Sequence, residues 1–189
     1  MGQAMAAPRG ELRIIGGEWR RRRIRFPSEP GLRPTPDRIR ETLFNWLGPR
    51  VVGSCTLDLF AGSGALGLEA LSRGAGHVDF VERSRAVAAA LRDNLELLGA
   101  AERAEVFQAA ALAWLESAAG PYDLVFLDPP FDSGLAPLAL ERLVARALLS
   151  PGHRIYLEQR RGAPAAPGWE VLRHAQAGTV EAVLLKRNG

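Results

Sequence analysis

Short apolar runs alternate with longer amphipathic stretches through most of the chain after residue 50. A continuous apolar run is typical of a strand buried on both faces, and a stripe at i, i+4 and i+7 is typical of a helix that packs on one side. The runs predict strands at Thr56–Phe60, His77–Val81, Glu105–Gln108, Asp123–Leu127 and Arg154–Glu158. The stretches between them predict helices at Ala65–Arg73, Arg85–Leu98, Ala111–Ala118 and Ala136–Leu149.

This alternation predicts an α/β fold of the Rossmann-like kind, with a mostly parallel sheet, helices on both faces and right-handed crossovers. Two more strands are expected at Trp169–Arg173 and Val180–Lys186. They could form a hairpin at one edge and bring the sheet to seven strands. We therefore expect one domain over residues 51–189, preceded by a small extension over residues 1–50.

The extension is strongly basic, with eleven arginines against five acidic residues, a balance of +6, whereas the remainder has a balance of −3. Arg13–Ile15 and Trp19–Phe26 predict two short strands around a Gly16-Gly17 turn. Candidate RNA-binding arginines lie on the second strand and the helix after it: Arg20, Arg21, Arg22, Arg23, Arg25 and Arg38. A cationic extension suggests a surface for a polyanion, although a solvated arginine-rich face explains the charge equally well.

A helix is expected at the end of the extension. Thr35 can serve as its N-cap, Pro36 suits its first position, and Asp37 favours the positive end of the helix dipole. Its apolar stripe, which indicates a packing face, consists of Ile39, Leu43, Trp46 and Leu47. Gly48-Pro49 should end it.

Composition excludes several classes of protein. No apolar run approaches the roughly 18 residues needed to span a bilayer, and the first ten residues lack a secretory h-region. Cys55, the single cysteine, lies in an apolar run and is expected to be a core residue in a reducing cytoplasm. No Cys/His cluster suggests a metal site.

A glycine pattern follows the first strand of the main domain. Gly62, Gly64 and Gly67 satisfy G-x-G-x-x-G, and glycines there let the backbone turn sharply and approach a ligand closely. Glu82 ends the next strand, twenty residues after Gly62, where a carboxylate can accept hydrogen bonds from ribose hydroxyls. NAD and S-adenosylmethionine (SAM) sites share these features, so the pattern alone does not choose between them.

Two details favour SAM. Asp58 lies inside the strand before the loop, where it could face the methionine ammonium group but would be poorly placed beside a pyrophosphate. Residues 59–64, with the sequence LFAGSG, also resemble the first motif of class I methyltransferases. The candidate cofactor-binding residues are Asp58, Phe60, Ala61, Gly62, Ser63, Gly64, Glu82, Arg83 and Ala110.

The candidate catalytic residues, Asp128, Pro129, Pro130 and Phe131, follow an apolar strand directly. They match the (Asn/Asp)-Pro-Pro-aromatic motif of amino-group methyltransferases. An exocyclic amine is a weak nucleophile because its lone pair is delocalised into the ring. Asp128 and the Pro129 carbonyl could accept hydrogen bonds from its two N–H groups, and Phe131 offers a face for base stacking. A base that carries such an amine must be splayed out of a duplex before it can react. The arginines of the extension would then neutralise the phosphates that flank the target base.

Residues 33–47, with the sequence RPTPDRIRETLFNWL, carry the most specific resemblance. Together with Arg13–Gly17 they resemble the bacterial RsmD family of 16S ribosomal RNA guanine-N2 methyltransferases, and the similarity runs from about Leu12 to Lys186. The resemblance implies a monomeric, Rossmann-like class I methyltransferase that acts late in small-subunit assembly on protein-bound RNA. It also implies SAM contacts within the candidate set above and catalysis at residues 128–131.

One departure concerns the residue after the third strand, where the family usually has Asp or Asn near the cofactor's adenine. This chain has Ala110 there, so we expect weaker SAM binding rather than lost function. Two alternatives remain open at this point. One is an amino methyltransferase of DNA adenine or of another RNA, and the other is an NAD-binding oxidoreductase or a non-catalytic RNA-binding protein.

Overall fold

The structure, a computed structural model, describes residues 9–32 and 35–188. The strands and helices of the first half are β1 (Arg9–Arg13), β2 (Arg23–Pro27), α1 (Asp37–Leu47), β3 (Cys55–Asp58), α2 (Ala65–Ser72), β4 (His77–Glu82) and α3 (Arg85–Leu98). Those of the second half are β5 (Ala104–Gln108), α4 (Ala111–Leu115), β6 (Tyr122–Leu127), α5 (Leu135–Ala145), β7 (Leu149–Arg160), β8 (Trp169–Ala177) and β9 (Val180–Arg187). Short 3₁₀ turns lie at Gly48–Val51 and Ala101–Arg103.

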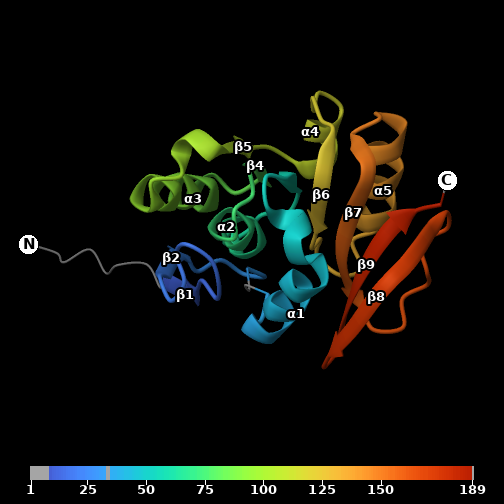
Figure 1. Cartoon of the computed structure of the whole chain (residues 1–189), viewed down its shortest axis with the longest axis horizontal. Coiled ribbons are helices and arrows are strands. Elements are labelled where there is room, and N and C mark those ends of the chain that lie inside the picture. The colour runs from blue at the N-terminus through green and yellow to red at the C-terminus, as the bar shows by residue number, and fades with distance from the viewer. Residues whose placement is uncertain (1–8, 33–34, 189) are drawn as a thin grey trace, which may run out of the picture.

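A seven-stranded sheet in the order β5-β4-β3-β6-β7-β9-β8 forms the centre of the molecule (Figure 1). β3 to β7 are parallel, and β9 lies antiparallel between β7 and β8. The predicted α/β fold and its edge hairpin are therefore confirmed. The chain builds outwards from β3 to β5 and then returns to place β6 on the other side of β3. Open α/β sheets bind ligands at such a switch point, beside the carboxyl ends of the strands.

Helices cover both faces of this sheet. One hydrophobic cluster contains most of the buried apolar residues of α1, α2, α3 and the β1-β2 hairpin, and the other contains those of α4 and α5. The first cluster runs without interruption from Leu12 and Trp19 through Phe44 to Phe126 and Tyr156 of the sheet. Edge-to-face ring contacts join Phe44 to Phe126 and Phe126 to Tyr156. The amino-terminal extension therefore shares its core with the sheet.

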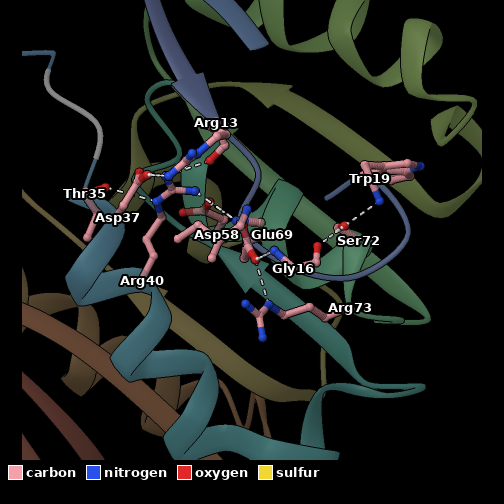
Figure 2. Close-up of polar contacts among 12 residues, drawn as sticks. Arg13, Gly16, Trp19, Thr35, Asp37, Arg40, Asp58, Glu69, Ser72 and Arg73 are labelled. Carbon is pink, nitrogen blue, oxygen red and sulfur yellow. Dashed lines mark hydrogen bonds and ion pairs between the residues drawn. The ribbon is translucent and has the colours of Figure 1, made fainter. Parts of the chain in front are cut away.

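A buried ionic network holds the extension on α2 (Figure 2). The carboxylate of Glu69 accepts hydrogen bonds from the backbone N–H groups of Ile15 and Gly16, at 2.9 and 2.8 Å. It also pairs with Arg40 of α1 at 3.4 Å and with Arg73 at 2.7 Å. Glu69 and Arg40 are almost fully buried, at 0% and 1% exposed, so removing either partner would leave an uncompensated buried charge.

The link between the two strands of the hairpin presses closely on the end of α2. Gly17 has a φ of 77°, and a Cβ built on it would stand 1.8 Å from the carbonyl oxygen of Ser72. The N–H of Glu18 donates to that oxygen at 2.7 Å, and the N–H of Trp19 donates to the Ser72 hydroxyl at 2.9 Å. Only glycine fits at position 17, because both the positive φ and the close approach exclude a side chain.

The hairpin strands differ from the prediction. β1 ends at Arg13, and β2 begins only at Arg23, so Arg20, Arg21 and Arg22 lie in the connection and not on a strand. The side chain of Trp19 is buried, and its backbone N–H bonds Ser72 at the end of α2, so the connection packs on that helix. The alternation of basic and apolar residues therefore marks a strand only from Arg23 onward, whereas Trp19 is a buried residue within the connection.

The start of α1 also differs from the prediction. The N-cap is Pro36, without a side-chain cap, and Asp37 is in the first turn as expected. Thr35 is not the N-cap, because its hydroxyl donates a hydrogen bond to Glu158 of β7 at 2.8 Å. The Thr35 hydroxyl therefore bonds a residue 123 positions away in the chain and does not cap the helix that follows it. Arg33 and Pro34 of the motif that carried the family resemblance lie outside the described residues.

Several boundaries moved. β3 ends at Asp58 rather than at Phe60, and α4 ends at Leu115. α5 ends at Ala145, because the chain turns at Ala147 (φ 53°) and enters a β7 that is longer than predicted. Among the described residues, no helix is long and apolar enough to cross a membrane, and no group of His, Cys, Asp and Glu could hold a metal ion.

Candidate active site

The glycine turn lies at the carboxyl end of β3, beside the switch point. The N–H of Leu59 donates to the carbonyl of Phe126 on β6, and the N–H of Ala61 donates to the carbonyl of Val81 on β4, so the turn is held from both sides. Gly62 and Gly64 have φ values of 51° and 78°, which favour glycine. A Cβ at Gly64 would also stand 2.5 Å from a methyl carbon of Leu91. Bonds to the strands on both sides thus fix the conformation of the turn, and the turn lies at the carboxyl edge of the sheet.

Asp58 lies directly beneath this turn. Its Oδ2 accepts the N–H of Gly67 at 2.9 Å, which ties the end of β3 to the first turns of α2. The side chain is 2% exposed. Burial raises the pKa of Asp58 to about 7, the Gly67 hydrogen bond opposes this, and the nearby carboxyl groups of Glu82 and Glu158 add to it. Asp58 is therefore a buried acid that a neighbouring cation would ionise.

Glu82 meets the turn from the end of β4. Its Oε2 accepts the N–H of Gly62 at 2.9 Å, and its Oε1 accepts the N–H of Ser84 at 2.6 Å. Twenty residues of sequence therefore separate two groups that are in direct contact. The side chain is half-buried, so the carboxylate lies at the rim of the turn, where the predicted ribose acceptor should be.

The catalytic candidates leave the end of β6, next to β3 in the sheet. Asp128 is partly buried and Pro129 is buried, whereas Pro130 and Phe131 are exposed. Burial is the largest cause that raises the pKa of Asp128 well above its ordinary value, followed by the carboxyl groups of Glu158 and Asp58. The loop brings Asp128 to the same sheet edge as the glycine turn, with the Phe131 ring facing solvent.

Two residues at this edge of the sheet, Glu158 and its partner Thr35, were not among the site candidates from the sequence. Glu158 ends the apolar part of β7 and is 4% exposed. Its Oε1 accepts hydrogen bonds from the hydroxyls of Thr35 and Tyr156, both at 2.8 Å. An acid as the last residue of a predicted apolar strand was visible in the sequence, and it parallels Asp128, which directly follows β6. The hydroxyl of Thr35 carried no such signal, because its partner is far away in the chain.

The segment before α1 crosses the same edge of the sheet. Ser84, after β4, donates to the carboxylate of Glu29 at 2.7 Å. A methyl carbon of Leu32 lies 2.8 Å from the point where a Cβ on Gly62 would stand. With the Thr35–Glu158 bond, these contacts place described parts of the segment at the ends of β4, β3 and β7 in turn.

The remaining cofactor candidates surround the turn. Ala61 and Ser63 are buried, and Phe60 is half-buried against the cluster on the α4 and α5 face. Arg83 is exposed beside Glu82. Ala110 is the N-cap of α4, without a side-chain cap, and lies just beyond the end of β5, where Gln108 pairs with Glu82. Asn94, a polar residue of α3, does not enter the site, because its amide donates to the Arg25 carbonyl at 2.9 Å.

Comparison with known proteins gives this geometry a family. The family model described as conserved hypothetical protein 95 matches residues 12–186. Ribosomal RNA small subunit methyltransferase D from Escherichia coli strain K12 is 45% identical over 181 residues, which cover 94% of this chain and 91% of the relative. The chain belongs to the RsmD family. Its Haemophilus influenzae relative of the same name is 44% identical over 177 residues, which cover 91% of this chain and 92% of that protein.

Solved structures agree with the RsmD assignment. The Escherichia coli protein yhhF aligns with a TM-score of 0.87 at 42% identity and covers 94% of this chain and 98% of its own. HI0767 from Haemophilus influenzae aligns with a TM-score of 0.81 at 40% identity, over 94% and 99%. The resemblance found in the sequence and the class I methyltransferase fold are thereby confirmed over nearly the whole chain.

The predicted substrate-binding arginines of this RsmD-family chain all have exposed side chains: Arg20, Arg21, Arg22, Arg23, Arg25 and Arg38. Glu11 of β1 pairs with Arg23 at 2.9 Å and lies 4.0 Å from Arg25. Within the described residues, the other four make no ion pair. The hairpin and its connection therefore present uncompensated positive charge to solvent.

Proposed function

We propose that this chain transfers a methyl group from SAM to the exocyclic N2 amino group of a guanine in 16S ribosomal RNA of the small subunit. One observation carries the proposal. The glycine turn after β3 and the Asp128–Phe131 loop after β6 adjoin at the switch point of the sheet. RsmD family membership supports a ribosomal RNA substrate, and the catalytic tetrapeptide supports an amino group as the acceptor.

The residues present fit SAM. Glu82 lies at the glycine turn as an acceptor for ribose hydroxyls, and the glycine backbone leaves room for close approach. Asp58 is a buried acid whose ionised form the methionine ammonium group would stabilise. The rest of the proposed contacts come from Phe60, Ala61, Ser63, Gly64, Arg83 and the backbone of Ala110. When bound, SAM supplies an electrophilic methyl group.

Asp128 and the loop that follows it would orient the acceptor. Asp128 and the carbonyl of Pro129 accept hydrogen bonds from the two N–H groups of the amine, which directs the nitrogen lone pair out of the ring plane. The two prolines hold that carbonyl rigidly, because their rings fix φ and their nitrogens carry no proton. Stacking of the flipped base on exposed Phe131 contributes about 1–3 kcal/mol. Orientation and charge complementarity supply the acceleration, without a covalent enzyme intermediate.

The basic extension would hold the RNA. Its exposed arginines lie on the face of the sheet that also carries α1, and the segment before α1 leads to Glu158 beside the catalytic loop. Residues 1–50 are therefore proposed as the RNA-binding part and residues 51–189 as the SAM-binding catalytic part. As the family resemblance implies, the enzyme would act as a cytoplasmic monomer on 16S RNA within the assembling small subunit.

The decisive experiment incubates the protein with radiolabelled SAM and small ribosomal subunits that lack their base methylations, and then identifies the labelled nucleoside. Wild type should place label in N2-methylguanosine. Asp128→Ala, which removes the acceptor altogether, should lower the rate by about 100-fold or more, the order of magnitude of a lost transition-state contact. Its SAM affinity, measured in parallel, should stay close to wild type, because Asp128 is proposed to contact the base.

Each other outcome has a distinct meaning. Label in another nucleoside would keep amino-group methylation and reject guanine N2. In a parallel reaction with duplex DNA, label in the DNA but none in subunits would reject the ribosomal substrate. Failure to bind SAM in any assay would reject the methyltransferase proposal itself.

A further inference from the structure

Glu158 lies next to the proposed catalytic aspartate in the sheet. β6 and β7 are parallel, and Leu127 pairs with Leu157. Asp128, the first residue after β6, and Glu158 of β7 each follow a member of this last pair, so both lie at the carboxyl edge of these neighbouring strands. Tyr156, two residues before Glu158 on β7, points into the cluster on the α1 face, so the period of two directs Glu158 to that face as well.

The carboxyl group of Glu158 is held in place from two directions. Tyr156, on its own strand, and Thr35, before α1, both donate hydroxyl hydrogen bonds to Oε1 at 2.8 Å. Thr35 is itself buried, and its carbonyl accepts the Nε–H of Arg40 at 3.1 Å. Arg40 in turn bonds Asp37, the carbonyl of Arg13 and Glu69 (Figure 2). A continuous chain of contacts thus runs from the basic hairpin to the acid beside Asp128.

The groups that face this pair are acidic or neutral, and the cation Arg40 contacts the Thr35 carbonyl rather than either acid. Asp58 faces the pair from β3, Tyr156 from β7 and Thr35 from the segment before α1. Burial raises the pKa of Glu158, and the hydrogen bonds from Thr35 and Tyr156 oppose that rise. Glu158 in turn raises the pKa of Asp128, since two carboxylates at one site repel each other.

We propose that Glu158 is a positioning residue for methyl transfer, which holds Thr35 at the sheet edge and acts on Asp128 from the neighbouring strand. The inference rests on the proposed function, in which Asp128 accepts the N–H groups of the target amine. Its neighbour then decides at which pH Asp128 is ionised and able to accept them. Because Glu158 also accepts the hydroxyl of Thr35, the residue that affects the ionisation of Asp128 is in direct contact with the segment that follows the basic hairpin.

Glu158→Gln separates the two roles. The glutamine oxygen still accepts the Thr35 and Tyr156 hydroxyls, but the negative charge beside Asp128 is gone. The pKa of Asp128 should fall, so the acidic limb of the kcat profile should move to lower pH by roughly one unit. Glu170→Gln, an equal charge change at an exposed residue paired with Lys186, serves as the matched control and should leave the limb in place.

Thr35→Val and Tyr156→Phe test the two contacts separately. Tyr156→Phe removes one donor from Glu158 and should move the acidic limb in the same direction by a smaller amount, and it replaces Glu158→Gln if that variant does not fold. Thr35→Val loosens the segment before α1 and should raise KM for the ribosomal subunit several-fold.

Carbon-13 NMR of aspartate carboxyl groups provides a readout without RNA. The Asp128 signal, assigned by its loss in Asp128→Asn, should titrate at lower pH in Glu158→Gln than in wild type. An unmoved titration together with an unmoved kcat limb would overturn the inference while wild-type methylation leaves the proposed function standing. If wild type labels no nucleoside, the proposed function fails, and the NMR titration alone still decides whether Glu158 acts on Asp128.

Discussion

At the scale of single residues, Asp58 shows how burial prepares an acid for a cationic ligand. In the unfolded chain its carboxyl group has a pKa near 3.8, and burial raises the value to about 7 in the folded protein. The folded protein therefore binds a proton that the unfolded chain releases, and folding loses stability as pH rises from about 4 to 7. A bound ammonium group would favour the ionised form and recover part of this cost.

The pH dependence of SAM binding follows from that sign. Affinity should approach its full value only at about pH 8 and above, and it should fall roughly tenfold or more between pH 7.5 and 5.5, as Asp58 takes up its proton. Calorimetric titration with SAM across this range measures it. Asp58→Asn removes the negative charge, so this variant should bind SAM weakly at every pH. Because it keeps an acceptor for the Gly67 N–H and has no carboxylate to bury, it should be more stable than wild type at pH 8, by on the order of 2–4 kcal/mol. A variant with wild-type affinity would remove Asp58 from the cofactor site.

At the scale of elements, the start of α4 is the weakest point of the proposed cofactor site. The helix has only five residues, and its N-cap, Ala110, offers no side-chain acceptor for the free N–H groups of the first turn. Most of the helices that cover the sheet pack on it through a stripe of several buried apolar residues, whereas α4 buries mainly Trp114 and Leu115. Its N-terminus therefore depends on backbone contacts such as the Ala109 N–H to Glu82 carbonyl bond.

Ala110→Asp should stabilise α4 and increase the affinity for SAM. An N-cap carboxylate satisfies a first-turn N–H group and typically contributes about 1 kcal/mol to stability. The same side chain could accept the adenine amino group, so SAM should bind several-fold more tightly than to wild type. Thermal unfolding and SAM titration measure the two effects, and Ala119→Asp, exposed just after α4, controls for charge alone. Weaker SAM binding by Ala110→Asp would contradict the proposed place of the adenine.

At the scale of the whole molecule, the basic extension and the sheet form one packed body with separated charge. The extension carries +6 and the rest of the chain −3, yet both contribute to a single hydrophobic cluster. Docking through Glu69, Arg40 and Trp19 fixes the hairpin on the face from which Thr35 reaches Glu158 at the carboxyl edge of the sheet. Positive charge on the surface is thereby placed in a fixed relation to the site.

Charge reversal at the hairpin should weaken RNA binding without affecting the cofactor. Arg21→Glu/Arg23→Glu should lower affinity for 16S RNA about tenfold or more at physiological salt and flatten its dependence on salt. SAM affinity should not change. Arg146→Glu/Arg187→Glu makes the same charge change at the ends of α5 and β9, away from the carboxyl edge, and should bind RNA nearly as wild type does. Equal losses in both double variants would show that only net charge matters.

The sequence by itself determined the class of fold and supplied most of the residues of the proposed site. Continuous apolar runs alternating with amphipathic stretches have few solutions other than a parallel sheet covered on both faces. Glycines that need positive φ, and the acids placed at strand ends beside them, follow directly from local pattern. Asp58, Gly62, Glu82 and Asp128 could therefore be named in advance, and α3 was predicted with its observed bounds.

Only the tertiary structure decided which distant groups meet. Thr35 caps no helix because Glu158 competes for its hydroxyl, and Arg20–Arg22 lie in a loop because Trp19 is buried against α2. The order of the sheet places β6 beside β3, and β7 beside β6, which sets Glu158 next to Asp128. Local preferences amount to a few tenths to about one kcal/mol per residue, so a buried long-range contact overrides them, and no local pattern records its partner.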